Sequence, residues 1–333
     1  MSVIYVREPG SHVRRAGERI VITKGRDDIA DAAIPEIESL ALIGNVQITT
    51  QALQALFEAG VDVSFMTSSG KLIGQAGAAA SRNVFLRLSQ YELYSDLERR
   101  LSFARIIVES KAKNQMSMIR NHKWKGGNPC LKHIKDIEEL KDSLSDAVSS
   151  NEIMGIEGKC AVIYFDAFAK MFHNSDFEFE GRNRRPPKDP INVLLSLGYT
   201  FLEREVTSAL YAQSFEMYLG FLHGIRYGRQ SLPLDIMEEF RQPVVDRFVL
   251  NNCNRRIFNR FDFEEEEGLP KFTTDGFRKY CQEFERLMNG ADGCCYREII
   301  RRQARLLKNA VMQKVDYYPF REEFLEEDSS CIS

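Results

Sequence analysis

The chain has 333 residues, enough for a large core and, by length, for two domains. Its net charge of −3 excludes a globally basic nucleic-acid-binding protein, so any contact with nucleic acid must come from local patches. The seven cysteines are scattered and lack CxxC spacing, which argues against a disulfide scaffold or a structural zinc site. There is no apolar secretory core or membrane-length apolar run, so we expect a reduced, cytoplasmic protein.

The first 75 residues alternate short β-prone runs with turn residues. The runs at 3–6, 19–23 and 61–66 are separated by Gly, Asp, Asn and Ser, which is typical of strands and turns. One helix interrupts them, with Thr50 as its expected cap. The small-residue run at 74–81 indicates a connector. We therefore expect an amino-terminal β domain over residues 1–75, a linker over 76–84 and a second domain over 85–333.

Helical periodicity dominates the second domain. Apolar residues recur at spacings of three and four over 85–120, and a charged, peripheral helix is expected over 131–149. The run 158–172 is apolar nearly all round, which is typical of a buried helix. An aspartate followed by a proline begins another core helix over 189–211. The predicted fold class is α+β, with a small β domain joined to a larger all-α domain.

Glu157 lies at the predicted start of the buried helix. A carboxylate in a first helical turn is favoured by the positive end of the helix dipole, which is one reading of this residue. The flanking Gly155 and Gly158 would also let a substrate or backbone approach closely, which a purely electrostatic role does not need. Both readings stay open on these residues alone.

His223 lies in the segment GFLHG, which predicts a short connection between helices. A lone histidine in an apolar setting is more often a satisfied core residue than a ligand. The residues that follow favour the ligand reading, because a helix that begins at Ser231, and that Pro243 kinks or ends, carries several acids.

On a helical wheel Asp235, Glu238, Glu239 and Gln242 share the face opposite the apolar one. The simplest reading of this face is a solvated surface. Glu238 falls at its boundary, nearest the apolar residues, and is therefore the acid of this helix that we expect to bind a metal. Asp235 lies one turn earlier, where it would complete the ligand set or bind through water.

One imidazole and well-separated carboxylates suit a divalent metal. Hard oxygen ligands favour Mg²⁺ or Mn²⁺, and an added imidazole shifts the preference toward Mn²⁺. Such a set leaves coordination positions for water or phosphate. Phosphodiester chemistry is therefore the function class that the pattern indicates.

Three basic segments are candidate DNA contacts. They are a proline-containing loop before the helix at 189–211, the segment after His223, and a late helix with basic residues three or four apart. The candidate side chains are Arg182, Arg184, Arg185, Arg226, Arg229, Arg301 and Arg305. For the loop and the late helix, ordinary solvation is the alternative.

Other features leave simpler alternatives. Tyr164 and Tyr199 would either position a DNA end or pack in the core, with packing favoured. The acidic run 264–267 falls in an expected hairpin and would repel DNA, and the acidic tail 322–328 would serve partner contact or solvation.

Four segments resemble the CRISPR-associated integrase family Cas one (Cas1). They are EGKCAVIYFDAF (157–168), NVLLSLGYTFLEREVTSAL (192–210), GFLHGIRYGRQSLPLDIMEEFRQPVVD (220–246) and the late YYPF. The resemblance covers most of the chain and includes the β domain joined to a helical domain. It places the family's glutamate on Glu157, its histidine on His223 and the acid of its EEFR segment on Glu238. Asp235 is the reserve ligand.

The resemblance implies a metal-dependent DNA integrase and endonuclease that uses Mg²⁺ or Mn²⁺ in CRISPR spacer acquisition. In this reaction a 3′-hydroxyl of captured double-stranded DNA attacks a phosphodiester of the repeat array, and the smaller protein Cas two (Cas2) assists. A homodimer joined through the β domain is also implied. Two other functions stay open, a stand-alone metal-dependent nuclease of DNA repair and a non-catalytic DNA-binding assembly subunit.

Overall fold

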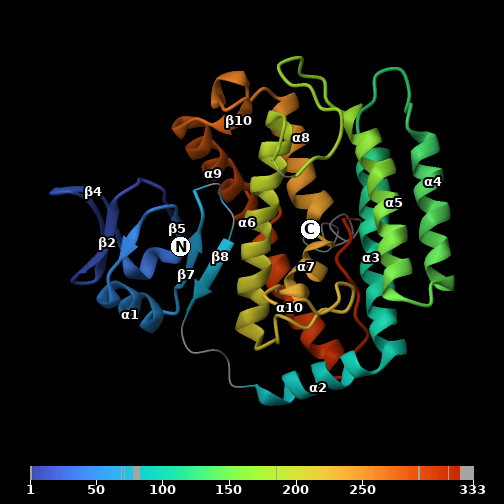
Figure 1. Cartoon of the computed structure of the whole chain (residues 1–333), viewed down its shortest axis with the longest axis horizontal. Coiled ribbons are helices and arrows are strands. Elements are labelled where there is room, and N and C mark those ends of the chain that lie inside the picture. Colours follow the sequence, from blue (N-terminus) through green and yellow to red (C-terminus); the bar gives the residue numbers. More distant parts are fainter. Residues whose placement is uncertain are drawn as a thin grey trace. The chain divides into compact units, whose positions relative to one another are not determined.

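The computed structural model describes residues 2–68, 70, 72–77, 83–184, 186–291, 293–313 and 315–322, and the side chain of Ser2 is not among them. The chain divides into two compact units, Met1–Ser81 and Arg82–Ser333 (Figure 1). Among the described helices, none is long and apolar enough to cross a membrane.

The first unit contains two four-stranded sheets. One sheet has the order β1 (Ser2–Val6), β5 (Ile37–Ile43), β7 (Asp62–Met66) and β8 (Leu72–Ala76), with the first three parallel and β8 antiparallel. The other has the order β4 (Asp27–Ala33), β3 (Arg19–Lys24), β2 (Ser11–Ala16) and β6 (Gln47–Ile48), antiparallel except for β6 beside β2. Helix α1 (Thr50–Glu58) packs against β2 and β7, and a 3-10 turn spans Ile34–Glu36.

The three β-prone runs fall in β1, β3 and β7, as predicted. The cap of α1 is Thr49 and not Thr50, because the Thr49 hydroxyl accepts the backbone N–H of Ala52 at 3.2 Å. The expected connector at 74–81 begins inside β8, so its first residues are ladder-bonded to β7. Residues 78–82 of the predicted linker lie outside the described part of the chain.

The second unit is mainly helical. Its helices are α2 (Val84–Ser95), α3 (Leu97–Asn121), α4 (Leu131–Asp142), α5 (Ser150–Ala169), α6 (Pro190–Gln213), α7 (Ser231–Met237), α8 (Arg247–Asn254), α9 (Thr274–Met288) and α10 (Tyr296–Val311). Shorter elements are 3-10 turns at Ser143–Asp146 and Arg260–Asp262, a π-helical segment at Arg241–Asp246 and the hairpin β9 (Phe263–Glu266) and β10 (Leu269–Phe272). Helices α3, α4 and α5 lie side by side, and α6 contacts α7 and α10 (Figure 1).

Several predicted boundaries hold. Asp189 caps α6 and Pro190 is its first residue, and the acidic run lies in the hairpin of β9 and β10. The helix expected over 85–120 is two helices, because Asp96 is extended and its carboxylate accepts the N–H of Arg99 at 3.1 Å. The expectation that 158–172 is buried on all sides is wrong, since Val162 is 73% exposed.

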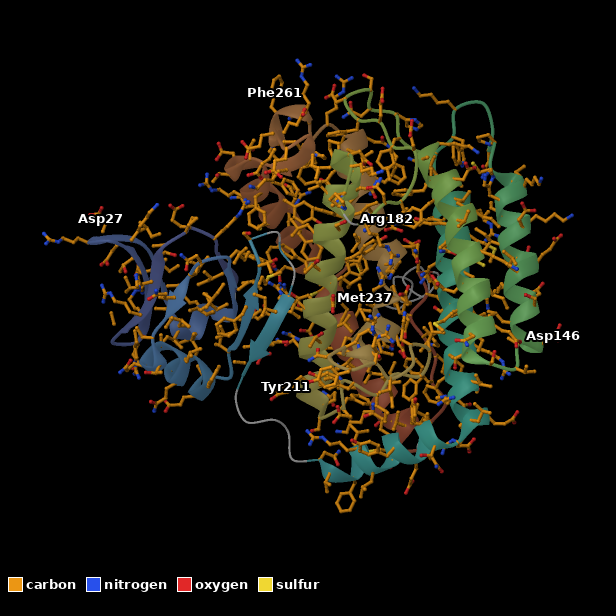
Figure 2. All side chains as sticks on the ribbon, in the orientation of Figure 1. Asp27, Asp146, Arg182, Tyr211, Met237 and Phe261 are labelled. Atoms are coloured by element: carbon orange, nitrogen blue, oxygen red, sulfur yellow. The ribbon has the colours of Figure 1, made fainter. Side chains whose placement is uncertain are left out.

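The core of the second unit is close-packed around α6. Met237 of α7 is buried within it, whereas Asp146 and Phe261 are exposed at the surface (Figure 2). A side chain at Gly198 would bring its Cβ within 2.6 Å of Val245, so only glycine lets α6 approach the π-helical segment this closely. This close approach fixes the segment that follows α7, and with it the acids at the end of α7.

Candidate metal centre

Glu157 lies well inside α5 and not at its start. The helix begins seven residues earlier, at Ser150, where the Ser149 hydroxyl accepts the N–H of Glu152 at 3.3 Å. The carboxylate of Glu152 accepts the N–H of Val148 at 2.9 Å, and Glu152 is the acid of the first turn. The predicted position of Glu157 is therefore wrong, and the helix dipole does not explain an acid in the helix interior.

The acidic face of α7 is buried. Asp235 and Glu239 are 0% exposed, Glu238 is 5% exposed and Gln242 is 1% exposed. The prediction of a solvated face, with Asp235 and Glu239 the more exposed acids, is wrong. Helix α3 contacts Glu238 and Glu239, the segment 315–322 contacts Glu239, and the loop 221–223 contacts Asp235, and a wheel drawn for one helix includes none of these neighbours. The regular α-helix also ends at Met237, before Glu238.

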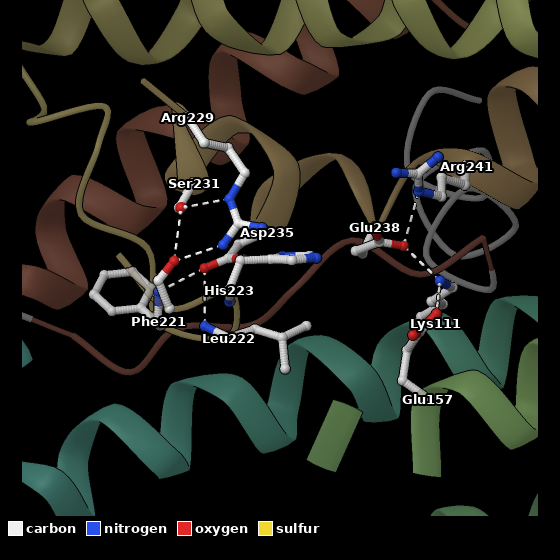
Figure 3. Close-up of polar contacts among 11 residues, drawn as sticks. Lys111, Glu157, Phe221, Leu222, His223, Arg229, Ser231, Asp235, Glu238 and Arg241 are labelled. Atoms are coloured by element: carbon white, nitrogen blue, oxygen red, sulfur yellow. Dashed lines mark hydrogen bonds and ion pairs between the residues drawn. The ribbon is translucent and has the colours of Figure 1, made fainter. Parts of the chain in front are cut away.

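Lys111 of α3 joins the two predicted carboxylate ligands. Its ammonium group bonds to the carboxylate of Glu157 and lies 2.6 Å from that of Glu238 (Figure 3). Arg241 adds a bond from Nε to Glu238 at 2.8 Å. Two acids from helices far apart in sequence therefore converge on one buried cation.

The charges of this cluster stabilise one another. Burial opposes ionisation of Glu238, but Arg241 and Lys111 outweigh it and lower the pKa of Glu238 to about 2. Burial likewise opposes the charge on Lys111, yet Glu238 and Glu157 raise its pKa above the ordinary value. The carboxylate of Glu238 is thus held ionised and ready for a cation at neutral pH.

Asp235 binds the loop that carries His223. One carboxylate oxygen accepts the Nδ1 of His223 at 2.6 Å and its backbone N–H at 3.0 Å. The other accepts the N–H groups of Phe221 at 2.5 Å and Leu222 at 2.9 Å (Figure 3). With Nδ1 donating to the carboxylate, Nε2 of the neutral imidazole keeps its lone pair. Asp235 therefore orients the histidine, and both of its oxygens already accept hydrogen bonds.

The environment of His223 favours its charged form. Burial lowers the pKa of His223, but the hydrogen bond and charge of Asp235, with the charge of Glu238, give a net rise above the ordinary value. The imidazole is a quarter exposed, so Nε2 is within reach of solvent or a ligand. Protonation of Nε2 would remove its lone pair, which links ligand binding at this nitrogen to pH.

Glu239 faces away from this cluster and fastens the segment 315–322. Its carboxylate accepts the hydroxyl of Tyr317 and the N–H of Phe320, the latter at 2.7 Å. Asn114 of α3 bonds to the backbone oxygens of Glu239 at 2.8 Å and Phe320 at 3.2 Å. Burial raises the pKa of Glu239 to about 7. The neighbouring acids Glu238 and Glu239 thus have separate roles, one at the cation and one at the chain's late segment.

The acidic tail begins in this ordered segment. Glu322 is 9% exposed and accepts bonds from Ser117 and Arg247, so the expectation of a flexible tail is wrong at its first residue. Residues 323–328 lie outside the described part of the chain.

The predicted DNA-contacting arginines differ in their surroundings. Arg182 is partly buried and bonds to Asn192 at 2.7 Å and Ser196 at 3.1 Å, so the expectation that it projects into solvent is wrong. Arg229 bonds to the backbone oxygen of Gly224 at 2.6 Å and supports the His223 loop. The exposed members are Arg184, Arg226, Arg301 and Arg305, with Arg301 bonded to Glu298, and Arg185 lies outside the described residues. Arg297, on the same late helix, is 4% exposed and pairs with Glu205 and Glu285.

The two tyrosines pack in the core. The hydroxyl of Tyr164 donates to Asp246 at 2.9 Å and that of Tyr199 donates to the same carboxylate at 2.5 Å. Arg241 and Arg182 lie over the Tyr199 ring at 4.6 and 5.3 Å. Burial raises the pKa of Asp246 to about 6. This network supports Arg241, which in turn bonds to Glu238.

As placed, no three His, Cys, Asp or Glu side chains among the described residues are close enough to hold one metal ion. The donor set nevertheless fits a divalent cation, because Glu157 and Glu238 already share a cation and His223 presents a lone pair. Sequence reasoning missed Lys111. The polar residues Ser110, Asn114 and Ser117, three or four apart on the same helix, were a signal that α3 has a buried polar face.

Known proteins have a similar fold and a related sequence. A family model for the CRISPR associated protein Cas1 matches residues 4–286. A CRISPR-associated endonuclease Cas1 from Thermus thermophilus is 31% identical, over 96% of this chain and 97% of the relative. The structure of a Cas1 protein from Thermotoga maritima superposes with a TM-score of 0.83 at 25% identity, over 94% of this chain and 97% of that chain.

Two further structures share the fold. A casposase bound to integration product has a TM-score of 0.83 at 24% identity, over 97% of this chain and 94% of that chain. A Cas6-RT-Cas1 chain in complex with Cas2 has a TM-score of 0.83 at 22% identity, and the match covers 96% of this chain and 36% of that chain. The matched family model and the full-length relative show that the chain belongs to the Cas1 family of CRISPR-associated endonucleases.

Proposed function

We propose that this Cas1 protein joins captured double-stranded DNA to a CRISPR repeat array by metal-dependent transesterification, acting in the cytoplasm with Cas2. The observation that carries the metal site is the convergence of Glu157 and Glu238, from different helices, on one buried ammonium group. A second copy of the chain would present a second site to the other DNA end. A structurally similar casposase bound to integration product and a Cas6-RT-Cas1 chain in complex with Cas2 support DNA and Cas2 as partners.

Glu157, His223 and Glu238 would hold the divalent ion, Mg²⁺ or Mn²⁺. A bound ion supplies Lewis acidity to the phosphoryl oxygen and offsets the negative charge that develops during attack. The chain's own residues hold the ligands in place. Asp235 fixes the ring of His223 and leaves Nε2 directed outward, and Arg241 fixes the carboxylate of Glu238. We assign Asp235 the orienting role and keep it as a reserve ligand.

Lys111 occupies the position that the metal ion would take between the two carboxylates. Its ammonium group neutralises the two carboxylates, and it must move aside for a divalent ion to reach them. Once displaced, it remains close enough to interact with a DNA phosphate. The exposed Arg226, three residues after His223, is placed to contact a phosphate next to the attacked bond.

A strand-joining assay tests this function. The protein, its Cas2, a DNA fragment with 3′-hydroxyl ends and a supercoiled repeat plasmid are incubated with Mg²⁺ or Mn²⁺. We expect covalent joining by the wild type and loss of joining without loss of DNA binding in Glu157→Gln and His223→Ala. Glu239→Gln, next to the proposed ligand Glu238, is the control and should still join. Cleavage without joining would support a stand-alone nuclease, and unchanged joining in both site variants would contradict the metal site.

A further inference from the structure

A second cluster of ionisable side chains lies at the carboxy-terminal ends of α3 and α5. His122 directly follows α3 and His173 follows α5, and their Nε2 atoms are 3.2 Å apart. They face a pocket of about 320 Å³ that residues of α8 also line. Along α3, the 11 residues from Lys111 to His122 correspond to about 16 Å, so this pocket is separate from the proposed metal site.

The two histidines are held in place by their neighbours. The backbone N–H of His173 donates to the side chain of Asn254 at 2.8 Å, and the Asn254 amide donates to the backbone oxygen of Met171 at 2.9 Å. The ring of Trp124 meets that of His122 edge-on at 4.6 Å, and its Nε1 donates to the backbone oxygen of Ile119 at 3.0 Å. The ring of His122 and the backbone of His173 are therefore positioned before any ligand arrives.

The polar part of the remaining lining is basic. Lys123, Arg247 and Arg255 line the pocket together with the amides of Asn121 and Asn251, and its apolar lining is Met118, Met171 and Leu250. No aspartate or glutamate is among the described residues that line it. Glu322 lies beside it only as the partner of Arg247. The three cationic side chains disfavour a divalent metal beside the two imidazoles and attract an anion.

Without an anion, the two facing nitrogens can share only one proton. One neutral imidazole donates its Nε2–H to the lone pair of the other, and two protonated rings would repel each other at 3.2 Å. Burial and the charge of His173 accordingly lower the pKa of His122 below its ordinary value near 6.5. An anion placed between the rings would accept a hydrogen bond from each and would favour protonation of both.

We propose that this pocket binds a phosphoryl group between His122 and His173, with Lys123, Arg247 and Arg255 as the surrounding charge. The phosphoryl group is either a phosphodiester of a DNA strand or a free phosphate. About 16 Å equals roughly five base steps of a DNA strand at 3.4 Å each, so a strand could reach both this pocket and the metal site. The assignment of a DNA phosphodiester as the ligand rests on the function proposed above, whereas the assignment of a free phosphate does not.

Binding should take up protons. With His122 neutral at pH 7 in the free chain, capture of the anion by two protonated rings draws protons from the buffer and is stronger at pH 6 than at pH 8. The other charged groups that face the pair are Lys123, Arg247 and Arg255. Free phosphate changes its own charge between pH 6 and 8 whereas a phosphodiester does not, so it is the pH dependence of DNA binding that reports on the two imidazoles.

The first test uses inorganic phosphate and NMR of the full chain. The chain has five histidines, so each ring signal can be assigned by single substitutions. We expect phosphate to shift the signals of His122 and His173 and to raise their apparent pKa values, and His122→Gln to abolish the response of His173. His12, an exposed residue of β2, is the matched control. No shift at either ring in 20 mM phosphate, about the upper limit for a specific weak site, would exclude free phosphate as the ligand.

The second test measures binding of a fluorescein-labelled DNA oligonucleotide at pH 6.0 and 8.0. If DNA supplies the phosphoryl group, the double variant His122→Gln/His173→Gln should bind about tenfold more weakly at pH 6.0 and within about twofold of the wild type at pH 8.0. For the double variant at pH 6.0, the slope of log affinity against log salt concentration should be shallower than that of the wild type by about 1. His12→Gln should match the wild type.

The two tests separate the possible outcomes. A phosphate response without a change in DNA affinity supports the phosphoryl pocket and assigns it to a free phosphate. Absence of both responses overturns it. Strand joining by the wild type, measured in parallel, tests the proposed function separately, because the NMR response does not depend on catalysis.

Discussion

Lys111→Met removes the cation that neutralises the two carboxylates of the proposed metal centre. Methionine has a similar length and leaves no charge between Glu157 and Glu238. In the wild type the Lys111 side chain is 7% exposed, as is that of Glu238, while the Glu157 side chain is 25% exposed. The variant therefore leaves two carboxylates near one another, with Arg241 as the remaining bonded cation.

The magnitude follows from these surroundings. Removal of one partner from a buried ion pair costs about 3–5 kcal/mol. The loss should be smaller here, because water screens the charge of Glu157 and because Arg241 remains bonded to Glu238. We expect the variant to lose about 2–3 kcal/mol in the free energy of unfolding, or roughly 4–12 °C in Tm for a unit of this size. Because the folded-state pKa of Glu238, about 2, lies below its ordinary value of 4.5, its ionised form contributes stability above about pH 4.5 that is lost as pH falls toward 2. The deficit of the variant should therefore shrink on acidification.

Thermal and urea unfolding of the two variants Lys111→Met and Lys113→Met, with and without Mn²⁺, measure the effect. Lys113 pairs with Glu109 on the same helix with side chains 27% and 35% exposed, so its loss should cost less than about 0.5 kcal/mol. Mn²⁺ should raise the Tm of Lys111→Met more than that of the wild type, because no ammonium group competes for the carboxylates. Equal stability of the two variants, or a larger Mn²⁺ effect on the wild type, would refute this reasoning.

Three further predictions concern the surrounding network. Asp235→Asn should weaken Mn²⁺ binding by about 10- to 100-fold. Because the pKa of His223 falls in this variant, the pH below which Mn²⁺ binding is lost should also fall. Calorimetric titrations between pH 5.5 and 8 measure both effects. The pKa of Glu239, raised to about 7, makes the wild type lose up to about 3 kcal/mol between pH 4.5 and 7, and urea titrations of Glu239→Gln should lack this slope. Tyr199→Phe removes a donor from Asp246 and should cost about 1–3 kcal/mol in urea unfolding while Mn²⁺ affinity stays within about twofold.

Local patterns predicted the elements but not how they cover one another. The cap at Asp189 and the hairpin at 264–267 depend on neighbouring residues, and both were correct. The start of α5 was placed too late because its first turns are polar, with Ser149 and Glu152 as a cap, and carry little apolar periodicity.

The site shows the same division. The resemblance picked out Glu157, His223 and Glu238, which the structure places on α5, in the loop before α7 and at the end of α7. A helical wheel could not show that α3 and the segment 315–322 bury the acids, nor that Lys111 bridges two of them. These contacts join residues 46 to 206 positions apart, and no local pattern in the sequence encodes them.

Mn²⁺ binding followed by electron paramagnetic resonance tests the central claim most directly, because it needs neither DNA nor Cas2. We expect one Mn²⁺ per wild-type chain and at least about tenfold weaker binding in Glu157→Gln, His223→Ala and Glu238→Gln, with Glu239→Gln close to the wild type. Wild-type affinity in both Glu157→Gln and Glu238→Gln would contradict a metal centre built on these two carboxylates.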